Sequence, residues 1–144
     1  MLKFTWNDGG KSESKRPQQA NDCVVRAIAI VTQVAYDDIY DELAMLGRSS
    51  GRGTDNRTWK DLVKAMGFDV QVIAGQETLA SVVSRIAGHK AIIGVRGHAI
   101  AFDGESLQDM LMTHPSSLVY ALALAPQKSR REFEVSLTKK VVYE

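Results

Sequence analysis

Apolar residues recur at helical spacing between residues 22 and 87 and follow the spacing of strands beyond Gly88. Helices are predicted over 22–34, 36–46, 58–66 and 77–87, with a strand over 68–73. Further strands are predicted over 1–6, 90–95, 98–102, 105–112 and 118–125, and a final pair over 133–137 and 140–143. Helices followed by strands predict an α+β fold, in which N-terminal helices pack on a C-terminal antiparallel sheet.

Length and composition suit a single domain. The 144 residues, of which 44% are hydrophobic, are enough to bury one core and too few for two ordinary domains. Within this domain, residues 1–21 are expected to form a strand and a polar loop, 22–87 the helical part and 88–144 the sheet.

Cysteine content, apolar runs and net charge restrict the cell compartment and the partners to be expected. A single cysteine excludes an intrachain disulfide, and polar residues interrupt the first segment where a secretory signal would be apolar. The apolar run 118–125 is far shorter than the roughly 20 residues of a membrane span. These features predict a soluble, cytoplasmic protein. The net charge of +1 makes nucleic acid an unexpected partner, and no motif indicates a metal or a cofactor.

The single cysteine, Cys23, lies where a polar segment becomes an apolar helix. Asn21 and Asp22 are both good N-cap residues, which places Cys23 in the first helical turn. Unpaired N–H groups and the positive end of the helix dipole favour a thiolate there, and a thiolate is nucleophilic. The competing interpretation is a small core residue beside Val24 and Val25, because free cysteine is among the most buried residue types.

A cysteine nucleophile needs a base, and that base needs a group to orient it. Of the three histidines, His98 is the best placed, because it follows Gly97 at the start of an apolar strand. His89 lies in a turn between a helix and a strand, and His114 lies in a loop beside Pro115. The alternative for His98 is a partly buried strand residue bonded to backbone.

Two aspartates could orient His98. Asp103 begins the predicted Asp-Gly hairpin turn at the far end of the same strand, roughly 16 Å away, and the turn already explains it. Centring the turn on Asp103 and Gly104 places Asp109 directly opposite His98, where paired side chains share a face about 5 Å apart. Asp109 is therefore favoured, and Asp103 remains the alternative.

Three segments together resemble a group of small proteins encoded by tailed phages and prophages: the opening 3–10, the Asn-Asp-Cys-Val-Val-Arg-Ala-Ile-Ala-Ile run at 21–30, and 36–43. The resemblance spans most of residues 1–110 and includes the path from Arg96-Gly97-His98 to the Asp-Gly turn. More broadly, the chain is similar to papain-like cysteine peptidases, in which a cysteine opens a central helix and the other site residues come from the sheet.

This resemblance implies a papain-like fold with Cys23 as nucleophile, His98 as base and Asp109 as orienting acid. It also implies a protein or peptide substrate, including proteins of a host cell, in whose cytoplasm the protein would act. Papain-like enzymes often place a glutamine before the cysteine as an oxyanion donor. Gln18 and Gln19 lie five and four positions upstream, neither of which is the usual spacing.

Three functions follow from this interpretation. The first is a cysteine-dependent hydrolase of a peptide, isopeptide or related amide bond. The second keeps the fold without catalysis, as a protein that binds and inhibits a host factor, and the third is a thiol acyltransferase. Arg26, the one charged residue on the apolar helix, is expected to pair with Asp22 or with an acid of the next helix. The sequence leaves the substrate and the oligomeric state open.

Overall fold

A computed structural model describes residues 2–142, with side chains through residue 137. The helices are η1 (Lys11–Glu13), α1 (Cys23–Thr32), α2 (Tyr36–Met45), α3 (Asn56–Ala65), α4 (Leu79–Arg85) and α5 (Arg130–Val142). The strands are β1 (Phe4–Trp6), β2 (Asp69–Thr78), β3 (Ala91–Val95), β4 (His98–Phe102), β5 (Leu107–Asp109) and β6 (Leu118–Leu124). Among the described helices, none is long and apolar enough to cross a membrane.

The strands form one six-stranded sheet in the order β1-β5-β4-β3-β6-β2. All neighbouring pairs are antiparallel except β1 and β5, which run parallel. The predicted α+β fold is confirmed as N-terminal helices with a mixed, mostly antiparallel sheet. The prediction of an antiparallel sheet built from 88–144 is wrong, because β1 and β2 come from before residue 88 and form the two edges, and β1 runs parallel to β5.

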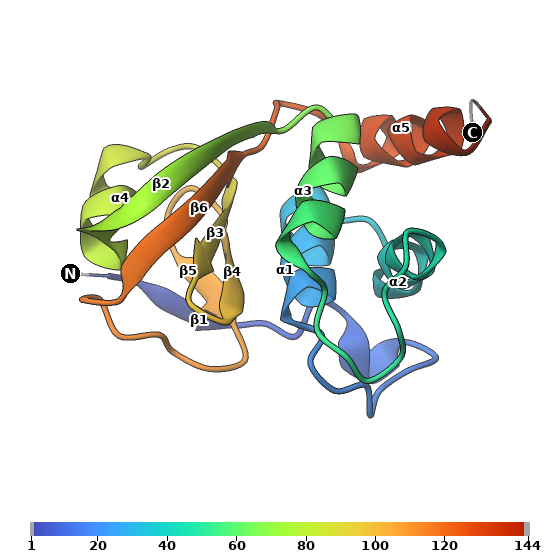
Figure 1. Cartoon of the computed structure of the whole chain (residues 1–144), viewed down its shortest axis with the longest axis horizontal. Helices are drawn as coiled ribbons and strands as arrows, with labels where there is room; N and C mark the ends of the chain where they lie inside the picture. Colours follow the sequence, from blue (N-terminus) through green and yellow to red (C-terminus); the bar gives the residue numbers. More distant parts are fainter. Residues whose placement is uncertain (1, 143–144) are drawn as a thin grey trace.

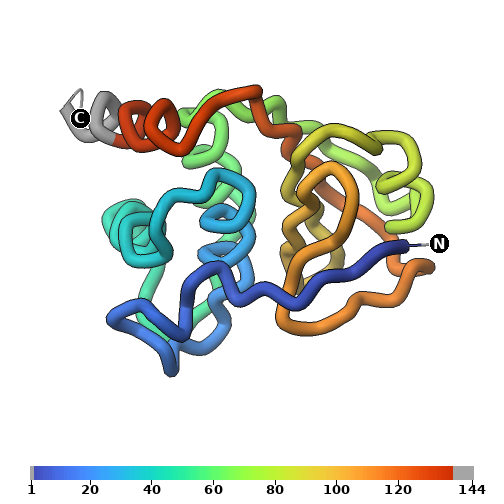
Figure 2. Tube along the Cα trace, turned by 180° about the vertical axis from the view of Figure 1, so that it is seen from behind, coloured from blue at the N-terminus to red at the C-terminus, as the bar shows by residue number. Residues whose placement is uncertain are grey.

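The sheet separates two layers of helix (Figure 1). Helix α1 packs against one face, with α3 beside it and α2 on its outer side, while α4 covers the opposite face. Seen from behind, the N-terminal segment runs beside β5 and then passes to the helical layer (Figure 2). The N-terminal residues thus reach both the sheet edge and the start of α1.

The two faces of the sheet carry side chains of different size. The face toward α1 presents mostly alanines, namely Ala99, Ala101, Ala121 and Ala123. The face toward α4 presents larger residues, including Ile93, Ile100, Phe102, Val119 and Leu122. Since protein interiors are close-packed, small residues on one face allow the helix above it to approach closely. The alanine face therefore brings α1 near to β4.

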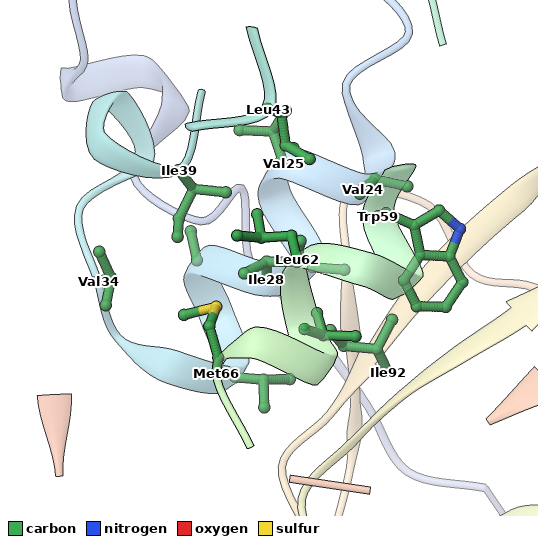
Figure 3. Close-up of a cluster of buried hydrophobic side chains, with 14 of the residues drawn as sticks. Val24, Val25, Ile28, Val34, Ile39, Leu43, Trp59, Leu62, Met66 and Ile92 are labelled. Carbon is green, nitrogen blue, oxygen red and sulfur yellow. The ribbon is translucent and has the colours of Figure 1, made fainter. Parts of the chain in front are cut away.

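Helix α1 is central, as its nearly continuous apolar sequence predicted. Val25 and Ile28 are fully buried, in contact with α2 and α3 rather than with the sheet alone. Figure 3 shows these side chains between Leu43 of α2, Leu62 of α3 and Ile92 of the sheet. Burial on several sides fixes the helix, and with it the position of Cys23 at its first turn.

The end of the chain differs from its prediction. Residues 133–137 and 140–142 are not strands but parts of α5, and Tyr143, like Met1, lies outside the described residues. Ser129 and Glu132 form a capping box, each side chain accepting a hydrogen bond from the other residue's backbone N–H. Phe133 and Leu137, one helical turn apart, are both buried, whereas Val135 between them is exposed.

Strand β2 is longer than predicted and α4 is shorter. The expected strand ended at 73 and the expected helix began at 77, but β2 pairs with β6 as far as Thr78. An irregularity between Val72 and Glu77 lets the strand continue past Gly75. The Thr78 hydroxyl accepts a hydrogen bond from Ser81 N at 3.2 Å and so caps α4.

Candidate active site

Cys23 is the first residue of α1, as predicted, and its side chain is partly buried. Asp22 stands at the N-cap position, but its carboxylate accepts no hydrogen bond from the helix N–H groups. It is bound instead by the Tyr36 hydroxyl at 2.6 Å and by Arg26 Nε at 3.0 Å. The N–H groups of the first turn are therefore left without a side-chain cap beside the Cys23 sulfur.

His98 opens β4 and contacts both Cys23 and Asp109. Its Nε2 lies 2.5 Å from Asp109 Oδ2, and its ring lies close enough to the Cys23 thiol for each group to shift the pKa of the other. Because Asp109 occupies Nε2, Nδ1 is the ring nitrogen left for the sulfur. The hydrogen bonds from Asp109 and then from Cys23 raise the pKa of His98 to about 9, against the effect of burial. The imidazole is therefore protonated at neutral pH.

The surroundings of Cys23 favour its thiolate. Burial alone raises the pKa of the thiol, but other contacts outweigh it and hold the pKa below its usual value. These are the hydrogen bond from His98, the backbone N–H of Ala99, and the positive charges of His98 and Arg26. A lowered thiol pKa beside a raised imidazole pKa is the direction of change that favours a thiolate–imidazolium pair, whose two protons titrate together.

The β4–β5 hairpin has a different register from the predicted one. Ala101 pairs with Gln108, so the register continues with Asp109 opposite Ile100 rather than opposite His98. The cause is the turn, which is centred one residue later because Asp103 accepts hydrogen bonds from the N–H groups of Glu105 and Ser106. Strand β5 is also shorter than the predicted 105–112: the later turn delays its start to Leu107, and it ends at Asp109. A displacement of two residues leaves side chains on the same face, so Asp109 still reaches His98.

The two candidate acids are thereby distinguished. Asp109, whose side chain is 3% exposed, lies at His98. Burial raises the pKa of its carboxyl, but the hydrogen bond and charge of His98, the Met110 N–H and Arg26 together lower it below the usual value. Asp103 remains in the turn and also accepts a hydrogen bond from the Gln108 side chain. Among the described residues, its hydrogen-bond partners are Glu105, Ser106 and Gln108, and His98 is not one of them.

Arg26 joins this site in a way that the sequence did not predict. Its Nη1 donates to Asp109 Oδ1 at 2.7 Å, and its Nε donates to Asp22 Oδ1 at 3.0 Å. The expected pair with Asp22 is confirmed, while the second acid comes from β5 rather than from α2. The spacing of four residues indicated the first contact. The second joins residues 83 positions apart and had no local signal.

The two glutamines proposed as oxyanion donors do not line the cavity at Cys23. Gln18 is exposed, and Gln19 is half-buried in contacts with the loop that follows α2. The Gln19 side-chain oxygen accepts from Gly51 N at 2.6 Å and from Arg48 at 3.3 Å. The Gln19 amide nitrogen donates to the Ser50 hydroxyl. Gln19 therefore holds the 48–51 loop against the segment before α1.

Cys23 and His98 line one cavity of about 480 Å³. Its walls include the aromatic rings of Trp59 and Tyr120, and Arg96 is the one arginine or lysine on its lining, which contains no carboxylate among the described residues. Trp59 is almost fully buried and bonded through its ring nitrogen to Asn56, so this wall is fixed. The nucleophile and base predicted from the sequence thus open onto a space that could receive a side chain.

A larger cavity of about 600 Å³ lies between the N-terminal segment and α1. Lys90, Asp103 and Gln108 contribute to its lining, but it contains neither Cys23 nor His98. Among the described residues, no cluster of three or more histidine, cysteine or acidic side chains could hold a metal ion. Of these two cavities, the smaller is therefore the one that carries a cysteine beside a histidine.

Comparison with known proteins does not assign the chain to a family. No protein-family model, curated protein or solved structure matches the chain.

Proposed function

We propose that this protein is a cysteine-dependent hydrolase that cleaves a peptide, isopeptide or related amide bond through an acyl-enzyme on Cys23. The observation that carries the proposal is the chain of contacts from Cys23 through His98 to Asp109, with Asp109 Oδ2 held 2.5 Å from His98 Nε2. A cysteine at a helix start, a base from the sheet and an acid orienting it match the papain-like arrangement that the sequence resembles.

In the first step, the Cys23 thiolate attacks the carbonyl carbon of the substrate and forms a C–S bond. As the tetrahedral intermediate collapses, the C–N bond breaks and the His98 imidazolium gives its proton to the leaving nitrogen. Asp109 keeps the ring oriented and stabilises its charge while the proton is still present. A thioester on Cys23 and a free amine are the products of this half-reaction.

In the second step, neutral His98 takes a proton from water while the water oxygen attacks the thioester carbon. The C–S bond breaks, the carboxylic acid leaves, and the thiolate–imidazolium pair is restored. For the oxyanion of both steps, the backbone N–H of Cys23 is the proposed donor, because the N–H groups of the first helical turn have no partner within the helix.

Alkylation of Cys23 by iodoacetamide tests this proposal without a known substrate, because the chain has no other cysteine. At pH 7 we expect the folded protein to react faster than a free thiol of ordinary pKa. His98→Ala should slow the reaction by about tenfold or more. His114→Ala is the matched control, because the ring of His114 contacts Ser116 in a distant loop. Slow alkylation that is indifferent to the loss of His98 would sink the proposal.

A second candidate is a protein of the same fold that binds and inhibits a host factor, in keeping with the resemblance to phage-encoded proteins. The placement of Gln18 and Gln19 favours it, because neither lines the cavity as an oxyanion donor. The two candidates differ in one measurement. If Cys23→Ala retains the full biological effect of the protein, the inhibitory function holds, and if that effect is lost in a folded variant, the hydrolase holds.

A further inference from the structure

Arg26 is the most buried arginine that contacts the site, with 11% of its side chain exposed. It binds two aspartates that are themselves only 3% exposed, Asp22 on one side and Asp109 on the other. An ion pair at this depth loses much of its hydration, so it is retained at a cost in stability unless its geometry is good. Arg26 satisfies both carboxylates at hydrogen-bond distance, at 3.0 and 2.7 Å.

The N-terminal segment covers this pair of contacts. Asn7 N donates to the backbone oxygen of Asp109 at 3.0 Å, which attaches the segment to the end of β5. Two residues later, a Cβ on Gly9 would lie 2.9 Å from the backbone oxygen of Arg26, so only glycine fits there. The segment therefore passes close over both residues and limits the access of water to them.

Asp109 divides its two oxygens between different partners. Oδ2 faces His98, while Oδ1 accepts from Arg26 at 2.7 Å and from Met110 N at 2.7 Å. A carboxylate with a partner on one oxygen alone could rotate about its Cβ–Cγ bond. Donors on Oδ1 remove that freedom, and the guanidinium supplies the only one of them that carries charge.

We propose that Arg26 is a positioning residue: by holding Asp109 Oδ1, it keeps Oδ2 on His98 and thereby keeps Cys23 reactive. This inference rests on the proposed roles of Cys23 and His98. The charged and titratable groups around Arg26 are Asp22 and Asp109, with Lys11 and Tyr36 bound to Asp22 behind it. His98 and Cys23 lie on the other side of Asp109.

The test compares the pH profile of Cys23 alkylation in Arg26→Ala, Arg26→Lys and Arg16→Ala. Arg16 is a matched control, because it also binds two carboxylates, those of Asp37 and Asp41, at 2.6 and 2.9 Å. We expect Arg26→Ala to slow alkylation at pH 7 by about tenfold, as one pKa unit of the thiol would. Arg26→Lys should recover part of the rate, because the ammonium group restores the positive charge but lacks the planar guanidinium that binds both carboxylates. Arg16→Ala should keep the wild-type profile.

A double variant separates positioning from general weakening of the fold. If Arg26 acts through Asp109, Arg26→Ala should add little to the effect of Asp109→Asn, whereas independent effects would multiply. Fully multiplicative effects, or a folded Arg26→Ala with the wild-type pH profile, would overturn the proposal. If Arg26→Ala does not fold, the folded Arg26→Lys decides, and a wild-type profile in that variant overturns it.

The outcome of this test is distinct from that of the proposed hydrolase. If the wild type itself alkylates slowly and without dependence on His98, the proposed function fails. If the wild type reacts rapidly and loses that rate in His98→Ala but keeps it in the Arg26 variants, the positioning role alone fails. Titration of the His98 ring by NMR gives an independent readout, because Arg26→Ala should lower its pKa from about 9 if Asp109 turns away.

Discussion

The β4–β5 hairpin carries an aspartate near each end, and the two carboxylates have different partners. At the closed end, Asp103 accepts hydrogen bonds from the backbone N–H groups of Glu105 and Ser106 and so shapes the turn. At the open end, Asp109 contacts two side chains, His98 of its own hairpin and Arg26 of α1. The hydrogen bonds of Asp103 form within the turn itself. Asp109 gains its contact with Arg26 only when α1 packs against the sheet.

The comparison shows that the surroundings, and not the residue type, assign a role to a carboxylate. Both aspartates have a pKa below the usual value, and in both cases burial opposes that shift. Backbone N–H groups lower the pKa of Asp103, whereas His98 is the leading cause at Asp109. A backbone donor is fixed in its protonation state, but an imidazole is not, so only Asp109 can influence a proton transfer.

The largest effect should come from Asp109→Asn. The amide cannot hold the positive charge of His98, so the thiolate–imidazolium pair loses its support. We expect turnover of any substrate that the wild type cleaves to fall by about 10²-fold or more. The steady-state rate of Asp103→Asn, measured in parallel, should stay within about twofold of the wild type. Equal losses of turnover in the two variants would contradict the different roles assigned to Asp103 and Asp109.

The pH dependence of stability should differ between the same two sites. Because the pKa of His98 is raised from 6.5 to about 9, its pairing with Asp109 stabilises the fold fully below about pH 6.5 and is lost as the pH rises through about 9. Because the pKa of Asp109 is lowered, its own contribution is lost only on acidification. The difference in free energy of unfolding between wild type and Asp109→Asn should therefore shrink by about 2 kcal/mol between pH 6 and 10. Denaturant unfolding at each pH measures it.

The corresponding difference for Asp103 variants should not depend on pH over that range, because backbone N–H groups do not titrate. If the difference in free energy of unfolding between wild type and an Asp103 variant also shrinks as the pH rises, the assignment of backbone N–H groups as the partners of Asp103 is contradicted.

The smallest effect is expected from Asp103→Ala. This change removes the acceptor for two backbone N–H groups of the turn, those of Glu105 and Ser106, which should cost about 1 kcal/mol of stability. The rate of Cys23 alkylation at pH 7 should be unchanged, since the turn lies at the far end of β4 from His98. Thermal unfolding measures the first expectation and mass spectrometry of the alkylated protein the second. A tenfold slower alkylation in this variant would show that the turn sets the position of Asp109.

Features with a local cause were predictable from the sequence. The start of α1 at Cys23 follows from the change of pattern around Asp22, and β4 was predicted with the bounds that it has, His98–Phe102. His98 and Asp109 were brought together by a two-residue periodicity that survives the shifted register. The signal for α5 was also local, since Ser129 and Glu132 have capping-box spacing, but the alternation of Phe133, Val135 and Leu137 favoured a strand.

Features that depend on distant segments were not predictable. No property of residues 4–6 indicates that they lie parallel to β5, and none of Arg26 indicates Asp109 as its second partner. The same holds for Gln19, whose contacts with Gly51 and Arg48 depend on where the next loop passes. Each of these contacts forms between groups that meet only through packing, so local pattern contains no information about it.

The parallel pairing of β1 with β5 also bears on when the thiol becomes reactive. Phe4 pairs with Leu107 and Trp6 with Asp109. The strand that carries Asp109 therefore pairs with a segment that lies far from it in the sequence. Contacts of such long range carry a larger entropic cost of loop closure than contacts within one hairpin. A partly folded chain would thus expose Cys23 as an ordinary thiol, without the partners that lower its pKa. For the proposed hydrolase, the reactivity of Cys23 therefore depends on contacts between segments that are far apart in the sequence.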